Sequence, residues 1–433
     1  MSDFVPERWP SILAEYKAAH KQLFSLVTDP QGLRVYVEKT QETRRLEQTE
    51  AMRRTAAFLD FAGNPEKQFK SVQIAGTSGK GSVTLMVAGL LEQLGWRVGH
   101  HTSPYLQTPA EKLVVDGRWI RPSAFTKLVD EFWKVHHKWG ESGGDFDRLK
   151  YGEAWVSLTF MHMAQAQVDW GVIETGMGGR FDPITSLPAE LSIITNVGWD
   201  HEKSLGPELT DIAWHKAGVI KKGQDVVTAV AEPDLLEVVR QEAAAQEATL
   251  FVFGEQFHVE LTGGGLTIEA PFGRYENLPL THGAGYQVQN MADVLAQRHN
   301  KHLSVDCIVQ ALNEMRMPGR MEVMQDDPLV IIDGAHNQPK MAALIETVQQ
   351  TYPDKKLTVI LGMLASKNAG QMLDVVMPAA ERLVVTRPFV PGKRPHSPEA
   401  LAADIQQMGN KPVHISANVG EALELAMGEA KAD

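Results

Sequence analysis

The sequence predicts an α/β protein in which a P-loop-containing, doubly wound, mostly parallel sheet is followed by a smaller C-terminal α/β domain. Three observations predict this fold. Short apolar runs rich in β-branched residues alternate with helical patterns between about residues 70 and 230. Glycine-containing polar loops follow these runs, at the strand ends where such sheets bind ligands. A second alternation begins after "MPGRM", residues 317–321, which we interpret as a hinge.

The elements can be assigned in order along the chain. Residues from about 10 to 62 have a helical pattern with a charged, exposed face. The next predicted strands are "KSVQIAG", "RVGHHTSPYL", "VDWGVIETGMGGR", "LSIITNVGWDH" and "QDVVTAV", with helices such as "SVTLMVAGLLEQLGW" and "YGEAWVSLTFMHMAQAQ" between them. A β-meander, "LTGGGLTIEAPFGRYENLPL", and two helices, "VQNMADVLAQRHN" and "SVDCIVQALNEMR", complete residues 1–316. Residues 322–433 contain "DPLVIIDGAHN", "KLTVILGML" and "ERLVVTRP" as strands, separated by helices.

Composition limits the classes of function. The 433 residues carry 42 Lys and Arg against 54 Asp and Glu, a net charge of −12, and show no basic cluster, so we expect no nucleic-acid partner. The single cysteine, Cys307, lies in an apolar helical pattern and is interpreted as a core thiol. The first residues lack a signal-peptide pattern and no apolar run is long enough to span a bilayer. We therefore expect a cytoplasmic protein without a membrane partner.

The stretch "VQIAGTSGKGSV" predicts a phosphate-binding turn. A strand, then residues 76–82, then a helix would present backbone N–H groups and a helix N-terminus to an anion. Within it we assign Gly79, Lys80, Gly81 and Ser82 to a nucleotide, with Lys80 as the charge for the β- and γ-phosphates. The usual early glycine is replaced by Ile74, so the loop is shorter than in common P-loop NTPases. The alternative is a structural turn with a surface lysine.

Several motifs, in order along the chain, resemble those of one family. "GTSGKGS" resembles the Mur ligase loop G-T-x-G-K-[GST]-[ST] and is most similar to "GTNGKGS" of the folylpolyglutamate synthase/dihydrofolate synthase family. "HTSPYL", "ETGMGGRFD", "ITNVGWDH", "HKAGVIKKG", "MPGR" and "IIDGAHN" resemble further motifs of that family. The resemblance implies an ATP-binding ligase domain with a central fold like that of Mur ligases over 1–316, and a Mur-like C-terminal domain over 322–433.

The resemblance also implies the reaction: ATP phosphorylates a carboxylate, an amine attacks the acyl phosphate, and an amide forms. Such chemistry brings a polyanionic nucleotide to a carboxylate, so cations must neutralise the charge. By resemblance, Ser103 and Glu174 hold one Mg²⁺, and His201 is a ligand of a second. Lys216 corresponds to the family lysine that becomes carbamylated, and its carboxylate would ligate the second Mg²⁺. The implied catalytic residues are thus Lys80, His201 and carbamylated Lys216.

The remaining site residues also follow from the resemblance. In the nucleotide site, Asn290 should contact adenine, Arg320 the phosphate from the hinge, and Asp333 the ribose. His336 and Asn337 should line the same cleft, with their roles unresolved. The alternative for these loop residues is turn and cap chemistry with the backbone.

The acceptor side departs from the family pattern. Phe181, Asp182 and Pro183 correspond to the acceptor-binding loop, but Pro183 replaces Ala. Lys150 and Gly152 stand where the family has Thr and Phe, and losing an aromatic face costs a stacked heterocycle on the order of 1 kcal/mol. We therefore expect the substrates to be ATP, L-glutamate and a folate-type or other carboxylate acceptor. We also expect the protein to be a monomer. A different acceptor for the same chemistry, and a nucleotide-binding homologue without activity, are the alternatives.

Overall fold

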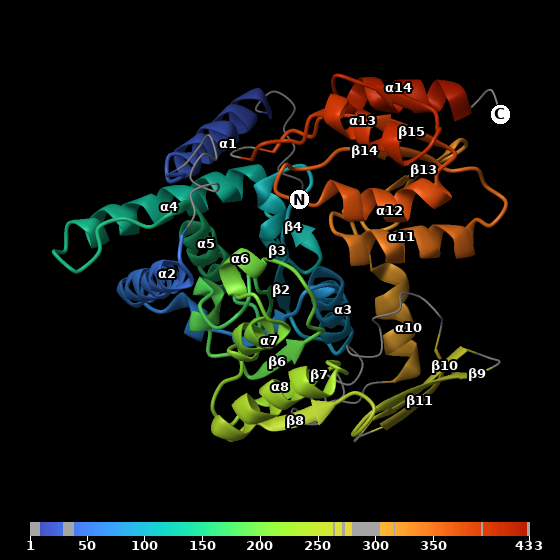
Figure 1. Ribbon diagram of the computed structural model, residues 1–433. Coiled ribbons are helices and arrows are strands. Elements are labelled where there is room, and N and C mark those ends of the chain that lie inside the picture. Colours follow the sequence, from blue (N-terminus) through green and yellow to red (C-terminus); the bar gives the residue numbers. More distant parts are fainter. Residues whose placement is uncertain are drawn as a thin grey trace. The chain divides into compact units, whose positions relative to one another are not determined.

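The computed structural model describes residues 9–28, 39–262, 265–270, 273–278, 304–315, 317–390 and 393–430. These residues form two compact units, one comprising the described residues up to 315 and the other those from Met317 onwards (Figure 1). Within these ranges, no helix is both long and apolar enough to cross a membrane.

The first unit is built on a sheet of eight strands in the order β4-β3-β2-β5-β1-β6-β7-β8. The strands from β2 to β8 in this order pair in parallel, and a β3–β4 hairpin adds antiparallel pairs at one edge. The predicted doubly wound, mostly parallel sheet is therefore confirmed. The bounds are β1 Lys70–Ala75, β2 Val98–His101, β3 Val114–Val115, β4 Arg118–Trp119, β5 Trp170–Glu174, β6 Leu191–Ile194, β7 Asp225–Thr228 and β8 Thr249–Val252.

Helices cover both faces of this sheet. One face packs against α3 (Lys80–Gln93) and α10 (Val305–Glu314), with side chains such as Val72 and Val87 in a common core. The other face packs against two groups of helices, and Ile173 and Ile194 point into their cores. Those helices are α1 Trp9–Phe24, α2 Gln41–Phe61, α4 Pro122–Gly140, α5 Tyr151–Gln165, α7 Leu209–Ala217 and α8 Pro233–Ala245.

Short elements complete the first unit. The predicted meander is confirmed as the antiparallel sheet of β9, β10 and β11, whereas the helix predicted from "VQNMADVLAQRHN" lies outside the described residues. The hairpin β3–β4, helix α4 and strand β8 were not predicted. The bounds are β9 His258–Thr262, β10 Gly265–Ala270, β11 Gly273–Leu278, α6 Glu202–Leu205 and the 3₁₀ helices η3 Pro65–Lys67, η4 Pro109–Lys112 and η5 Pro183–Ser186.

The second unit is the predicted smaller α/β domain. Its parallel sheet has the order β14-β15-β16, and its core is formed by residues such as Leu373 and Leu383. The predicted strand in "DPLVIIDGAHN" instead forms an antiparallel pair with the preceding strand. The bounds are β12 Glu322–Asp326, β13 Leu329–Ile332, β14 Thr358–Leu361, β15 Arg382–Val385, β16 Val413–Ile415, α11 Gln338–Thr351, α12 Ala369–Ala379, α13 Pro398–Met408 and α14 Val419–Ala430.

Candidate active site

The loop between β1 and α3 has the conformation of an anion-binding turn. Gly79 caps α3 in the left-handed region, with φ of 79°, which favours glycine. The side-chain oxygen of Asn196 accepts hydrogen bonds from the backbone N–H groups of Thr77 and Ser78, at 3.2 and 2.9 Å. The Asn196 amide thus fixes the turn before α3. The free backbone N–H groups at the N-terminus of α3 are therefore positioned to bind an anion.

Lys80 is the first residue of α3, and its ammonium lies at the loop. Its Nζ donates a 3.0 Å hydrogen bond to the carbonyl of Gly76 and is 4.0 Å from Oε1 of Glu174. Gly81 lies against the same carboxylate, because a Cβ built there would be in ordinary van der Waals contact with Oε2 of Glu174, at 3.4 Å. Ser82 follows in the first helical turn and is half-buried. The structure therefore brings the predicted phosphate lysine next to the predicted metal carboxylate.

Glu174 ends β5, and its side chain is buried, with the residue only 5% exposed. The backbone N–H of Ser103 donates a 2.7 Å hydrogen bond to its Oε2. An ionised carboxylate at this depth requires compensating charge or donors, and Lys80 and Ser103 supply part of it. Carboxylate and hydroxyl oxygens are hard ligands of the kind Mg²⁺ prefers, so the Ser103–Glu174 pair fits the ion that the resemblance implies.

The residues predicted for a second metal lie on different elements. His201 precedes α6 with φ of 57°, its side chain is 51% exposed, and its backbone N–H donates to Asp200. Lys216 lies in α7 and is only 3% exposed. Within the described parts of the chain, no three His, Cys, Asp or Glu side chains are grouped so as to hold a metal ion. The second metal site stays a prediction.

The helix that carries Lys216 is fixed by Arg180, which the sequence analysis did not place in the site. The backbone N–H of Arg180 donates a 2.7 Å hydrogen bond to the carbonyl of His215, and its guanidinium lies 4.1 Å from the Trp214 ring centroid. The same guanidinium pairs with Glu242 of α8. Arg180 lies in the quoted "ETGMGGRFD" motif, but its aromatic partner is distant in sequence, so no local pattern indicated the contact.

The predicted acceptor loop, residues 181–183, is organised by Asp182. One carboxylate oxygen accepts from the N–H groups of Gly176 and Met177, at 2.9 and 3.1 Å, and the other from Ile184 at 2.9 Å. Burial raises the pKa of Asp182, although these donors oppose the rise. The side chain of Phe181 is directed toward α7, where its ring centroid lies 5.9 Å from that of Trp214. Asp182 thus shapes the loop, whereas Phe181 packs on α7.

Beside Ser103 lies a cavity of about 370 Å³. It is open to solvent and is bounded by α2, the β2 loop, η4, the start of α5 and the loop of residues 176–184. A Cβ on Gly152 would meet nothing within 4 Å, so the Phe-to-Gly departure from the family pattern leaves open space. The lining residues are Ala51, His101, Ser103, Lys112, Lys150, Gly152, Glu153, Trp155, Val156, Gly176, Asp182, Pro183 and Ile184.

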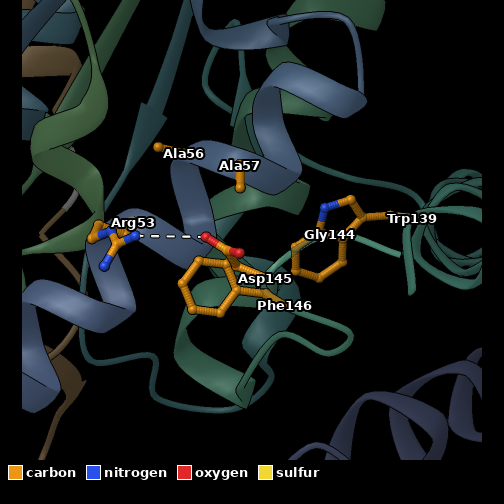
Figure 2. Close-up of a pocket in the computed structure, with 7 residues that line it drawn as sticks. All are labelled: Arg53, Ala56, Ala57, Trp139, Gly144, Asp145 and Phe146. Carbon is orange, nitrogen blue, oxygen red and sulfur yellow. Dashed lines mark ion pairs between the residues drawn. The ribbon is translucent and has the colours of Figure 1, made fainter. Parts of the chain in front are cut away.

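A second pocket of about 370 Å³ lies between α2 and the segment that follows α4 (Figure 2). Its lining includes the rings of Trp139 and Phe146 and the ion pair of Arg53 with Asp145, whose charged atoms are 3.7 Å apart. Both members of this pair are largely exposed, and none of the predicted site residues lines the pocket. We assign it no catalytic role.

In the second unit, Asp333 fastens two loops together. Its carboxylate accepts from the backbone N–H groups of Met321 and Ala335, at 3.0 and 2.7 Å. Arg320 is exposed, and Asn337 caps α11 through the N–H of Lys340. The ring of His336 forms a 2.7 Å hydrogen bond with the carbonyl of Gly334.

Asp333, His336 and Asn337 thus lie together at the start of α11. The guanidinium of Arg320 lies against Gly334, where an added Cβ would meet its Nη1. Asp333 and Asn337 make the backbone bonds expected of turn and cap residues. Asn290 lies outside the described residues.

Comparisons with known proteins agree on one family. Residues 319–433 match the family "Mur ligase, glutamate ligase domain". The chain is 32% identical over 401 residues to the folylpolyglutamate synthase of Lacticaseibacillus casei, covering 87% of this chain and 93% of that protein. It is 32% identical over 330 residues to the dihydrofolate synthase/folylpolyglutamate synthase of Bacillus subtilis, covering 72% and 75%. The solved Mycobacterium tuberculosis folylpolyglutamate synthase complexed with ADP superposes with a TM-score of 0.84 at 27% identity, covering 97% and 92%.

Proposed function

Because the chain belongs to the folylpolyglutamate synthase/dihydrofolate synthase family, we propose that it is an ATP-dependent ligase that joins L-glutamate to a folate-type acceptor. The observation that carries the proposal is the grouping of Lys80, Glu174 and Ser103 beside an open cavity. A phosphate-binding turn, a buried carboxylate and a cavity for a second substrate are the parts that carboxylate activation by ATP needs.

The residues have distinct tasks in the proposed reaction. An acceptor carboxylate oxygen attacks the γ-phosphorus of ATP, the bond to ADP breaks, and an acyl phosphate forms. The glutamate nitrogen then attacks the acyl carbon, phosphate leaves, and the nitrogen loses its proton. The loop of Gly79, Lys80, Gly81 and Ser82 holds the phosphates through N–H groups and one ammonium. Mg²⁺ held by Ser103 and Glu174 would neutralise charge on the transferring phosphoryl group.

A second Mg²⁺ site at His201 and Lys216 is part of the proposal. The burial of Lys216 supports it, because desolvation favours the neutral amine that captures CO₂, and the resulting carbamate is an oxygen ligand. Lys216→Ala should cut turnover severely, and short carboxylic acids should restore part of it by supplying the missing ligand. Loss of turnover without any rescue would point to a structural lysine.

We also propose that residues 317–321 act as a hinge between domains 1–316 and 322–433. Movement about it would bring Arg320 to the ATP phosphates, with Asn290 and Asp333 at the adenosine. Support comes from the left-handed backbone at Gly319, with φ of 64°, and at Met321, with φ of 46°. Asp333 bonds to the N–H of Met321, so it ties this segment to the start of α11.

Phosphate release tests the function directly. Purified protein with MgATP should release phosphate only when both L-glutamate and an acceptor are present, and dihydropteroate and tetrahydrofolate separate the two activities of the family. Lys80→Ala should abolish turnover, while Lys222→Met, a change at a 77% exposed side chain, should not alter it. Release with non-folate carboxylates alone would favour the same chemistry on another acceptor. ADP binding without any release would indicate a non-catalytic homologue.

A further inference from the structure

Lys112 lines the cavity beside Ser103 and has a setting unlike that of a surface lysine. It is the last residue of η4 and is half-buried. Its Nζ lies 5.5 Å from the Trp155 ring centroid and 5.8 Å from that of Tyr105, so two aromatic faces flank the ammonium. Burial lowers the pKa of Lys112 to about 8.

Neighbouring residues order the segment that carries Lys112. The carboxylate of Glu111 accepts the N–H groups of Leu106, Gln107 and Thr108 at 2.7 to 2.8 Å, which fixes the turn before η4. The buried ring of His101, which also lines the cavity, forms a 3.0 Å hydrogen bond with the Thr159 hydroxyl. Burial lowers the pKa of His101 to about 3, so this ring is neutral and adds no charge to the site.

The charge of Lys112 is only partly compensated. Within the described residues, no carboxylate lies within 4.0 Å of its ammonium. The carboxylate of Glu174 attracts the ammonium from a greater distance, but it also accepts the N–H of Ser103 and lies 4.0 Å from the ammonium of Lys80. A desolvated cation without a close counter-ion is energetically costly, so an anion that enters the cavity would be stabilised beside it. The cavity lies between the Ser103–Glu174 pair and the loop of Asp182 and Pro183.

We propose that Lys112 binds the acceptor carboxylate that is to be phosphorylated, and so orients its oxygen toward the γ-phosphate. The inference rests on the proposed ligase function and names a residue that the sequence motifs did not assign. The ammonium stays protonated throughout: it offsets the charge of the carboxylate and of the acyl phosphate, and it takes no part in bond making.

The test compares Lys112→Met and Lys112→Arg with the surface control Lys222→Met. Lys112→Met should raise the acceptor KM at least about tenfold, because a buried charge pair loses one partner, while the ATP KM stays within about twofold. Lys112→Arg keeps the charge and should recover most of the acceptor affinity. Unchanged melting temperature and ADP affinity show that the variants are folded. An acceptor KM in Lys112→Met equal to that of the control would overturn the proposal.

A binding measurement separates this inference from the ligase function. The wild type should bind tetrahydrofolate more tightly, by about tenfold, than an analogue whose carboxylates are converted to amides, and Lys112→Met should lose most of this preference. If no phosphate is released with any acceptor but the preference disappears in Lys112→Met, the function fails and the anion site stands. If ligation occurs and the preference survives in Lys112→Met, the role of Lys112 is refuted.

Discussion

The backbone N–H of Ser103 donates a 2.7 Å hydrogen bond to Oε2 of Glu174, and this bond joins the loop after β2 to the end of β5. The other carboxylate oxygen lies 4.0 Å from the ammonium of Lys80, at the start of α3. A single buried carboxylate therefore connects the turn between β1 and α3 with the edge of the cavity beside Ser103, at the carboxyl ends of neighbouring parallel strands.

This relationship predicts the behaviour of Glu174→Gln. The amide keeps the shape and can still accept from Ser103, but it removes the charge that would hold Mg²⁺ and balance Lys80. We expect turnover to fall at least about 100-fold and the Mg²⁺ concentration for half-maximal activity to rise. Phosphate release across a Mg²⁺ titration measures both. A variant with normal turnover and an unaltered Mg²⁺ requirement would rule out the metal role.

Gly76→Ala should damage the predicted nucleotide site by a steric clash. Gly76 has φ of 153°, and an added Cβ would lie 1.8 Å from Oγ1 of Thr195, whose hydroxyl donates to the carbonyl of Ser78. Thr195 must move and the turn loses a fixing bond, so we expect ADP affinity to fall at least about tenfold. Calorimetric titration with ADP measures it. Gly428→Ala, where a Cβ would meet nothing within 4 Å, is the control and should leave ADP affinity unaltered.

The parts of the fold and site that follow from local patterns were predictable from sequence. The strand, turn and helix around Lys80 are encoded within a dozen residues. The proximity of Ser103 and Glu174 was expected from the family resemblance and not from a local pattern. The hairpin β3–β4 was not predicted, because strands of two residues are too short to show a periodic pattern of apolar residues. The cation–π contact of Arg180 with Trp214 and the aromatic setting of Lys112 depend on tertiary packing, which no local pattern encodes.

The buried pair of Arg54 and Glu153 predicts a large stability effect. Two hydrogen bonds of 2.8 Å join the side chains, which are 8% and 4% exposed. Arg54→Met leaves a buried carboxylate unpaired and should lower the free energy of unfolding by about 3 kcal/mol. Arg54→Met combined with Glu153→Leu should recover much of this loss.

Urea unfolding measures these changes, and the neighbouring ion pair of Arg53 with Asp145 supplies the control. Its side chains are 66% and 82% exposed (Figure 2). Arg53→Met should therefore change the free energy of unfolding by less than about 1 kcal/mol. Equal effects of the two arginine changes would contradict the assigned burial.

Glu92, near the end of α3, predicts a pH dependence of stability. Burial, and secondly the charge of Asp116, raise the pKa of Glu92 from 4.5 to about 7 in the folded protein. The folded state therefore holds a proton that the unfolded state has lost, so this residue lowers stability progressively as the pH rises from about 4.5 to about 7. The loss is complete above that range. Glu92→Gln removes the ionisation, so the variant should gain about 1 kcal/mol over the wild type at alkaline pH, the shift being discounted for the partial exposure of the residue. Thermal unfolding at pH values on either side of this window measures the gain, which should vanish on the acidic side. A gain of the same size at every pH would mean that packing, and not the carboxylate charge, is what Glu92→Gln changes.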